Sequence, residues 1–313
     1  MDGHTLARST REGLHESSAG TFMNSRTTYD YLYAGAIAFN MRAHLLVSSQ
    51  TITVVQGTTS YNLNSDFAGM ANEDSAGREF IKFTVNSADY FIYPMDYSQS
   101  VLGNSTAQGA IPIGYYILKA TPPSNVTGTA TSTGVLSNGE TTLTDSNASY
   151  TTVAVGDLIH NTTDDSHGVV VSVTNSTTII CSLFEGTTNQ FTSGDAYIII
   201  PQARFKLVID PAPSQSATIS FNYAQRPNPV YSPYRAYNYP FEYVNVLVNY
   251  AVACYKAKDR DFATSQAIMG LADKQIRDTA AQLRRSLPQR NNFRLDLMGK
   301  GNRGNPHQQW GRR

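Results

Sequence analysis

The densest group of side chains that could do chemistry lies in the segment TTDDSHG, where Asp164, Asp165 and His167 stand almost side by side. Neighbouring carboxylates are the ligands that a hard cation such as Ca²⁺ prefers. The same residue types also favour a turn, and here they separate two short apolar runs, DLIH and GVVVSV. We expect a turn at this segment and no metal site.

Other signatures of catalysis or cofactor binding are incomplete. The segment GKGNRG resembles a phosphate-binding glycine loop, but it follows no predicted strand and precedes no helix. Cys181 and Cys254 lie far apart in apolar runs, which is typical of packed thiols rather than of zinc ligands or nucleophiles. No G-x-S-x-G motif occurs. A glycan hydrolase requires two carboxylates that the fold brings together, and the sequence does not exclude that two of the scattered acids meet in this way. The sequence favours a chain that is not an enzyme and has no cofactor.

Charge is unevenly distributed along a chain whose formal net charge is zero. Only 15% of its 313 residues are charged, against about 25% in an average globular protein. From 120 to 203 there is no Lys or Arg, so we expect an acidic surface there. Its seven acidic residues are Glu140, Asp145, Asp157, Asp164, Asp165, Glu185 and Asp195. We expect neither a membrane span nor a secretory leader, because the N-terminus is polar and no apolar run is long enough.

Hydrophobic periodicity predicts an α+β chain, with a helical core and an antiparallel β domain that carries an inserted small β-sandwich or barrel. The helical core combines an N-terminal helix with a C-terminal helix pair. Thr27 or Thr28 is placed to cap the first helix, and Asp259 or Asp261 to cap the last. The predicted parts are an N-terminal arm (1–26), a helix with an antiparallel β region (27–120), an inserted β module (121–201), a returning β-hairpin with a Tyr/Pro loop (202–240), the C-terminal helices (241–287) and a basic tail (288–313).

Within the β region, TITVV and SYNL flank the turn segment QGTT and predict a β-hairpin. Further strands are predicted at 79–86, 89–96 and 111–120. The strands that follow the inserted module are expected to rejoin the sheet that ends at Ala120.

The Tyr/Pro loop before the C-terminal helices is rich in both proline and aromatic residues. Proline at this density excludes a helix interior or a central strand. Aromatic loops either pack on their own domain or form an interface with a partner, and both interpretations stay open. The possible interface residues are Tyr231, Tyr234, Tyr237 and Tyr239.

The C-terminal tail is basic and also carries large apolar side chains. From Arg284 to the end there are eight basic residues and one acidic residue, Asp296. A purely solvating tail would not need aromatic anchors, so we favour an interaction arm over a solubilising end. The residues expected to dock are Arg284, Arg285, Arg290, Phe293, Arg294, Lys300, Arg303, Trp310, Arg312 and Arg313.

The order of these segments resembles a known family. A helix and short linker precede TITVVQGTTSYNLNSDF, and a late strand, ISFNYAQRPNPV, precedes the helical segment FEYVNVLVNYAVACYKAKDRDFATSQAI. This order is similar to that of the head-to-tail adaptor, or connector, proteins of tailed bacteriophages, especially the adaptor (tail tubular protein A) of short-tailed phages. The segment from 134 to 200 also looks like a β module that recurs as an insert in phage structural proteins.

The resemblance implies a homo-oligomeric ring, commonly a dodecamer, at the neck of the virion, assembled in the host cytoplasm. Its expected partners are other copies of itself, the portal protein, and tail nozzle, tube or fibre proteins. Double-stranded DNA would pass through the ring during genome ejection without sequence-specific binding, and no membrane is involved. The basic tail would dock on the portal. The alternatives are a tail tube, nozzle or collar subunit, or a carbohydrate- or receptor-binding tail protein. An exposed aromatic trio in the module would support the second, but the module has only Tyr150, Phe184, Phe191 and Tyr197 to offer.

Overall fold

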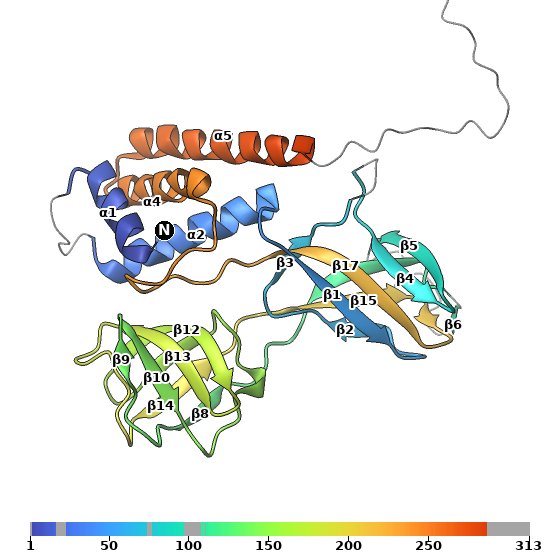
Figure 1. Ribbon diagram of the computed structural model, residues 1–313, viewed down its shortest axis with the longest axis horizontal. Helices are drawn as coiled ribbons and strands as arrows, with labels where there is room; N and C mark the ends of the chain where they lie inside the picture. The colour runs from blue at the N-terminus through green and yellow to red at the C-terminus, as the bar shows by residue number, and fades with distance from the viewer. Residues whose placement is uncertain (1, 17–22, 74–76, 97–107, 110, 287–313) are drawn as a thin grey trace, which may run out of the picture.

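The computed structural model describes residues 2–16, 23–73, 77–96, 108–109 and 111–286. This part of the chain has a mixed α/β fold, in which the helices pack together beside two large, mainly antiparallel sheets (Figure 1). The described helices, which we call the helical layer, are α1 (Gly3–Gly13), α2 (Ser25–Ala43), α4 (Val244–Lys258) and α5 (Phe262–Ser286). Two short 3₁₀ turns are η1 (Tyr150–Thr152) and η2 (Phe241–Tyr243).

An eight-stranded sheet, which we call the body sheet, has the order β1-β17-β4-β5-β7-β15-β2, with β3 also paired to β17. All its pairs are antiparallel except β5 with β7. A two-stranded parallel sheet of β6 and β16 lies apart from it. The bounds are β1 (Val47–Val54), β2 (Ser60–Asn62), β3 (Phe67–Met70), β4 (Ile81–Val85), β5 (Ala88–Pro94), β6 (Gln108–Gly109), β7 (Gly114–Lys119), β15 (Phe205–Asp210), β16 (Ala212–Pro213) and β17 (Ala217–Gln225).

The hairpin predicted for TITVV and SYNL is wrong. β1 pairs along its whole length with β17, whereas β2 pairs with β15 at the other end of the sheet. The reason is the number of backbone hydrogen bonds that each partner can form with β1. The nine-residue β17 pairs with all eight residues of β1, whereas β2 is only three residues long. Side chains still link the two ends: Gln50 donates to Asn62 O at 3.3 Å and accepts the N–H of Asn64 at 3.1 Å, and the Tyr61 hydroxyl bonds the backbone of Val55 at 3.2 Å.

The chain leaves the body sheet after β7 and returns to it in β15, which pairs directly with β7. The residues between them form a seven-stranded antiparallel sheet, the module, in the order β8-β14-β11-β12-β13-β10-β9. A bond from Thr131 N to Thr144 O (2.8 Å) brings opposite sides of this sheet together, so it is nearly a closed barrel. The bounds are β8 (Val126–Thr129), β9 (Leu136–Ser137), β10 (Glu140–Thr144), β11 (Leu158–Asn161), β12 (Ser166–Asn175), β13 (Thr178–Phe184) and β14 (Ala196–Ile200).

Helix α1 replaces the irregular arm that was expected at the N-terminus, so that expectation is wrong for residues 3–13. The carboxylate of Asp2 caps the helix by accepting the N–H of Thr5 at 2.9 Å. Leu6 is fully buried against the other helices, and burial of one leucine contributes about 1.5–3 kcal/mol. The sequence hid this helix because its inner face is made mostly of small or polar residues, such as Ala7 and Thr10.

The other helices begin at capping residues that only partly match the prediction. Asn24, not Thr27 or Thr28, caps α2, because its side-chain oxygen accepts the N–H of Thr27 at 2.6 Å. Asp261 accepts the N–H of Thr264 at 3.2 Å and thereby caps α5, as predicted.

The module docks on the helical layer through the Tyr/Pro loop. Arg235 of the loop donates two hydrogen bonds to Glu140 of β10, at 2.6 and 2.9 Å. The Ser232 hydroxyl donates to Asn138 O, and Phe184 of β13 packs against Tyr231 with ring centroids 6.1 Å apart. Module and helices therefore share one apolar core.

Replacing Arg235 with alanine should loosen this docking while leaving the module itself folded. The bidentate pair is partly buried, so we expect its loss to cost about 1–2 kcal/mol. Hydrogen–deuterium exchange should rise at residues 138–140 and 232–237 but not in the module core around Leu143. Lys82→Ala, which breaks an exposed pair with Asp89 in the body sheet, is the control and should leave both segments unchanged. Equal exchange in R235A and wild type would contradict this account of docking.

Candidate interface surfaces

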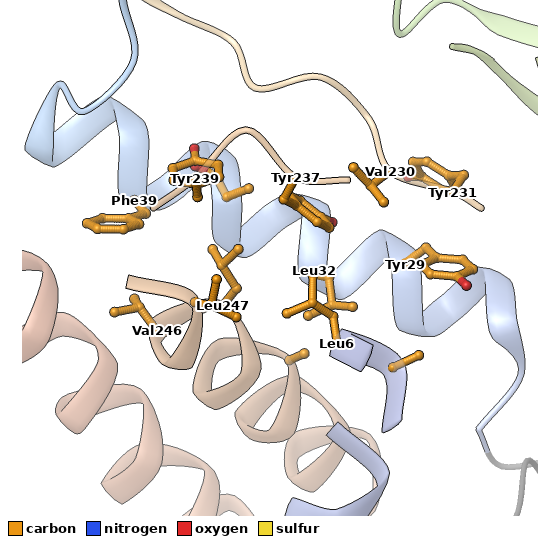
Figure 2. Close-up of a cluster of buried hydrophobic side chains, with 14 of the residues drawn as sticks. Leu6, Tyr29, Leu32, Phe39, Val230, Tyr231, Tyr237, Tyr239, Val246 and Leu247 are labelled. Carbon is orange, nitrogen blue, oxygen red and sulfur yellow. The ribbon is translucent and has the colours of Figure 1, made fainter. Parts of the chain in front are cut away.

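The inner face of α2 holds the helical layer together. Leu32, Ala36 and Phe39 recur on this face and are fully buried, as Figure 2 shows for Leu32 and Phe39. Gly35 lets α4 approach closely, because a Cβ there would lie 3.0 Å from Tyr250 Cβ. This face is therefore committed to contacts within the chain.

The outer face of α2 is apolar and is not fully covered by the chain. Ala34, Ile37 and Ala38 are half-buried, and Met41 is 52% exposed. Together with Arg42 these residues line a shallow hollow, and we call this surface the outer patch. Arg42 pairs with Asp273 of α5, which closes one side of the patch. Small side chains on a helix permit another helix to approach closely.

The Tyr/Pro loop packs largely on its own chain, so the interface expected there is reduced to one tyrosine. Tyr231, Tyr237 and Tyr239 are all buried (Figure 2), and only Tyr234 is exposed, at 67%. Tyr231 donates to Asp30 at 2.6 Å, and Tyr239 donates to the carbonyl of Ala36 at 2.8 Å. Burial, followed by the adjacent Asp30 carboxylate, raises the pKa of Tyr231 well above its usual value. Three of the four tyrosines are therefore core residues.

The predicted docking tail lies mostly outside the described residues. Arg284 and Arg285 belong to α5, which ends at Ser286. The other predicted docking residues, from Arg290 to Arg313, belong to the segment that the structure does not describe. The expectation that they form an interaction arm stays a prediction.

The acidic surface expected on the module is much reduced, because three of its seven acids are buried. Asp145, Asp157 and Asp195 are buried, and Glu140 is paired with Arg235. Asp145 accepts the hydroxyl of Tyr197 at 2.8 Å. Only Asp165 and Glu185, of the seven acids, are classed as exposed. Neutral donors satisfy Asp145 and Asp195, whereas Glu140 and Asp157 pair with arginines that lie outside the stretch without Lys or Arg.

Two of the buried carboxylates, Asp157 and Asp195, have pKa values that are shifted in opposite directions. Burial raises the pKa of Asp157, although Arg204 and the backbone of Ala154 and Gln202 donate to it. Burial also acts to raise the pKa of Asp195, but donors on Thr192 and Asn161 outweigh it and leave the pKa lowered. The Asp195 carboxylate thus stabilises the fold in its charged form.

The aromatic residues of the module offer no platform for a sugar ring among the described residues. Tyr150, Phe191 and Tyr197 lie in the module core, and Phe184 packs against Tyr29 and Tyr231. Base or sugar stacking needs an exposed aromatic face. This arrangement gives no support to the carbohydrate-binding alternative.

Both cysteines are packed inside the fold, and the TTDDSHG segment forms the expected turn. The structure adds one histidine, His160, to the residues of that turn. Burial raises the pKa of both Cys181 and Cys254, which disfavours the reactive thiolate. The expected turn joins β11 to β12. The structure, however, brings His160 beside Asp165 and His167. The residues predicted from the sequence did not include His160. The available signal was its spacing, because His160 and His167 lie at equal distances from the turn and therefore face each other across the hairpin.

The comparisons with known proteins add no identity to this geometry. No protein-family model matches the chain, and no curated protein matches it significantly. Within the described part, no helix has the length and apolar character needed to cross a membrane.

Substituting Asp195 with asparagine should destabilise the module in a pH-dependent way. The amide turns one acceptor into a donor that faces Thr192 or Asn161, so we expect a loss of about 1–3 kcal/mol at neutral pH. Because the folded-state pKa of Asp195 is lowered, its stabilisation is full above the ordinary pKa and is lost as the pH falls through the folded value. The difference between D195N and wild type should therefore shrink below about pH 4.

Urea denaturation followed by circular dichroism between pH 7 and pH 3 measures this difference. Glu185→Gln, at an exposed acid of the same module, is the matched control and should cost little at any pH. A constant difference across the pH range would show that the Asp195 carboxylate is not the stabilising form.

Proposed function

We propose that this chain is a structural subunit of the head-to-tail adaptor ring of a tailed phage, located at the neck of the virion. In this role it binds other copies of itself, the portal protein on one side and tail proteins on the other, and lets double-stranded DNA pass. The observation that carries the proposal is the outer patch, an uncovered apolar helix face beside an otherwise well-packed helical layer. Exposed apolar patches of this kind typically mark protein–protein contacts.

A ring requires one surface of each subunit to fit a different surface of the next. The outer patch supplies one such surface, and Ala34 and Ala38 are small enough for a helix of a neighbour to pack closely there. Helix α5 offers a second surface at Leu271, which is 49% exposed; Phe262, 60% exposed, lies nine residues away and therefore on the opposite face of the helix. These two surfaces belong to different helices, as a head-to-tail contact needs.

The docked module supports the same role. Because its loop ends and β13 share a core with the helices, it is held at a set position rather than swinging on its two connections to the body sheet. A ring that transmits force from portal to tail needs such fixed parts. Because three of the module's seven acids are buried and Glu140 is paired with Arg235, few charges remain on the module surface, which suits contact with protein, and its lack of Lys and Arg avoids retention of DNA.

Electron microscopy of the purified chain should show closed rings. Ala38→Glu should abolish them, because it places a charge in the proposed contact, and we expect self-association to weaken by at least about tenfold. Ala88→Glu, a similar change at an exposed position of β5, is the control and should leave rings intact. Rings that form equally in A38E would contradict the assignment of the outer patch.

Truncation after Leu287 should weaken binding to the portal protein of the same particle. The truncation removes Phe293 and Trp310 and six of the eight basic residues of the C-terminal region. Wild-type affinity, measured by biolayer interferometry, should fall more steeply with salt than that of the truncated chain, because ion pairs are screened. Ring formation should survive the truncation, which separates docking from assembly. Unchanged portal affinity would exclude the docking arm.

A further inference from the structure

Two histidines face each other across the β11–β12 hairpin of the module. In this antiparallel pair His160 lies directly opposite His167. Their rings are stacked, with centroids 3.9 Å apart and planes 26° from parallel. The positions are set by backbone pairing on two adjacent strands, so the two imidazoles are held together by the fold of the barrel.

The side chains of Asn161 and Asp164 stabilise the turn between the strands, so the Asp165 carboxylate is not needed for the turn. Asn161 accepts the N–H groups of Thr163 and Asp164 through its side-chain oxygen, at 3.0 and 3.1 Å. The Asp164 carboxylate accepts N–H groups from the loop at 187–189 at 3.0–3.2 Å. Asp164 is therefore structural. Asp165 takes a left-handed backbone conformation, with φ of 54°, and its carboxylate reaches the histidine pair.

The donor atoms of these three residues converge. His160 Nε2 lies 3.1 Å from Asp165 Oδ1, and a ring nitrogen of His167 lies within 4.8 Å of both. His167 Nδ1 is 3.2 Å from the backbone carbonyl of Asp165. A carbonyl only accepts, so this contact places the proton of neutral His167 on Nδ1 and the lone pair on Nε2. Such a bond to the second ring nitrogen is the usual way in which a metal-binding histidine is oriented.

The distances suit one small metal ion. Ligand atoms about 2.0–2.1 Å from a tetrahedral zinc ion lie about 3.3–3.4 Å from one another, close to the separation of His160 Nε2 and Asp165 Oδ1. The side chains of His160 and Asp165 are 29% and 87% exposed, so an ion can reach them from solvent. Two imidazoles and one carboxylate are typical ligands of Zn²⁺ and its transition-metal neighbours, whereas Ca²⁺ and Mg²⁺ prefer oxygen alone.

We propose that His160, His167 and Asp165 form a binding site for a divalent transition metal ion of the zinc class. The three residues supply three ligands, and the fourth position faces solvent, where a water molecule completes the coordination. Binding joins β11, β12 and the turn through one ion and so stabilises the outer hairpin of the module. The proposal does not depend on the adaptor function.

Equilibrium dialysis of the metal-stripped full chain against zinc, with metal analysis by mass spectrometry, tests this site. His160→Gln and His167→Gln should each remove about one zinc ion per chain, with affinity lowered by about tenfold or more. Asp165→Asn keeps a residue that tolerates the left-handed backbone and should weaken binding less. His4→Gln, at an exposed histidine of α1, is the control and should bind as wild type does.

A second measurement on the wild-type chain does not depend on the folding of any variant. Zinc should protect His160 and His167 from modification by diethyl pyrocarbonate, read by peptide mass spectrometry, and should leave His4 and His44 unprotected. The same concentration of Ca²⁺ or Mg²⁺ should protect neither. Equal modification with and without zinc, equal zinc binding by the two histidine variants and wild type, or protection by Ca²⁺ would each overturn the proposal.

Discussion

The structure depends above all on how the Tyr/Pro loop buries its tyrosines between the helices and the module. Tyr239 stacks on Phe39 of α2, and Tyr231 contacts Tyr29, Tyr33 and Phe184. Buried tyrosines bring large apolar areas and also a hydroxyl that needs a partner, which Asp30 supplies for Tyr231 and the carbonyl of Ala36 for Tyr239. Without these buried tyrosines, α2 would lose the contacts on one side, and the module would lose much of the apolar surface by which it docks on the helices.

The polar interior of the module shows a second constraint. A small barrel of short strands has many loops whose backbone N–H groups must be bonded. Carboxylates are strong acceptors for them: Asp157 and Asp164 each accept two or more backbone N–H groups, and Asp195 accepts one together with the Thr192 hydroxyl and the Asn161 amide. The absence of Lys and Arg from 120 to 203 is compatible with this arrangement, because the partners are backbone amides, a hydroxyl, a side-chain amide and one arginine, Arg204, just before β15.

The proposed functions use different surfaces of the same molecule. The outer patch on α2 and the exposed side of α5 are suited to contacts between subunits, while the histidine pair lies at a hairpin of the module. Because the module is fixed to the helical layer by Arg235 and Phe184, a metal ion that stabilises the hairpin would act within a part of fixed position. The adaptor role and the metal site can thus be judged separately.

The sequence by itself determined the elements whose signal is local. The periodicity of α2, the Asp261 cap of α5 and the turn at TTDDSHG follow from residues within a few positions of one another. The sequence also predicted that the chain returns from the module to the body sheet, because the composition changes at both ends of the module. These features depend on backbone propensity and short-range hydrogen bonds, which a single segment contains.

Only the tertiary structure decided which segments meet. β1 pairs with β17 rather than β2, α1 packs where an arm was expected, and three of the module's seven acids are buried. The meeting of His160 with Asp165 and His167 likewise needed the register of β11 and β12. In each case the deciding free energy comes from burial and strand pairing between distant residues, and a linear pattern carries no record of which distant partner offers the larger gain.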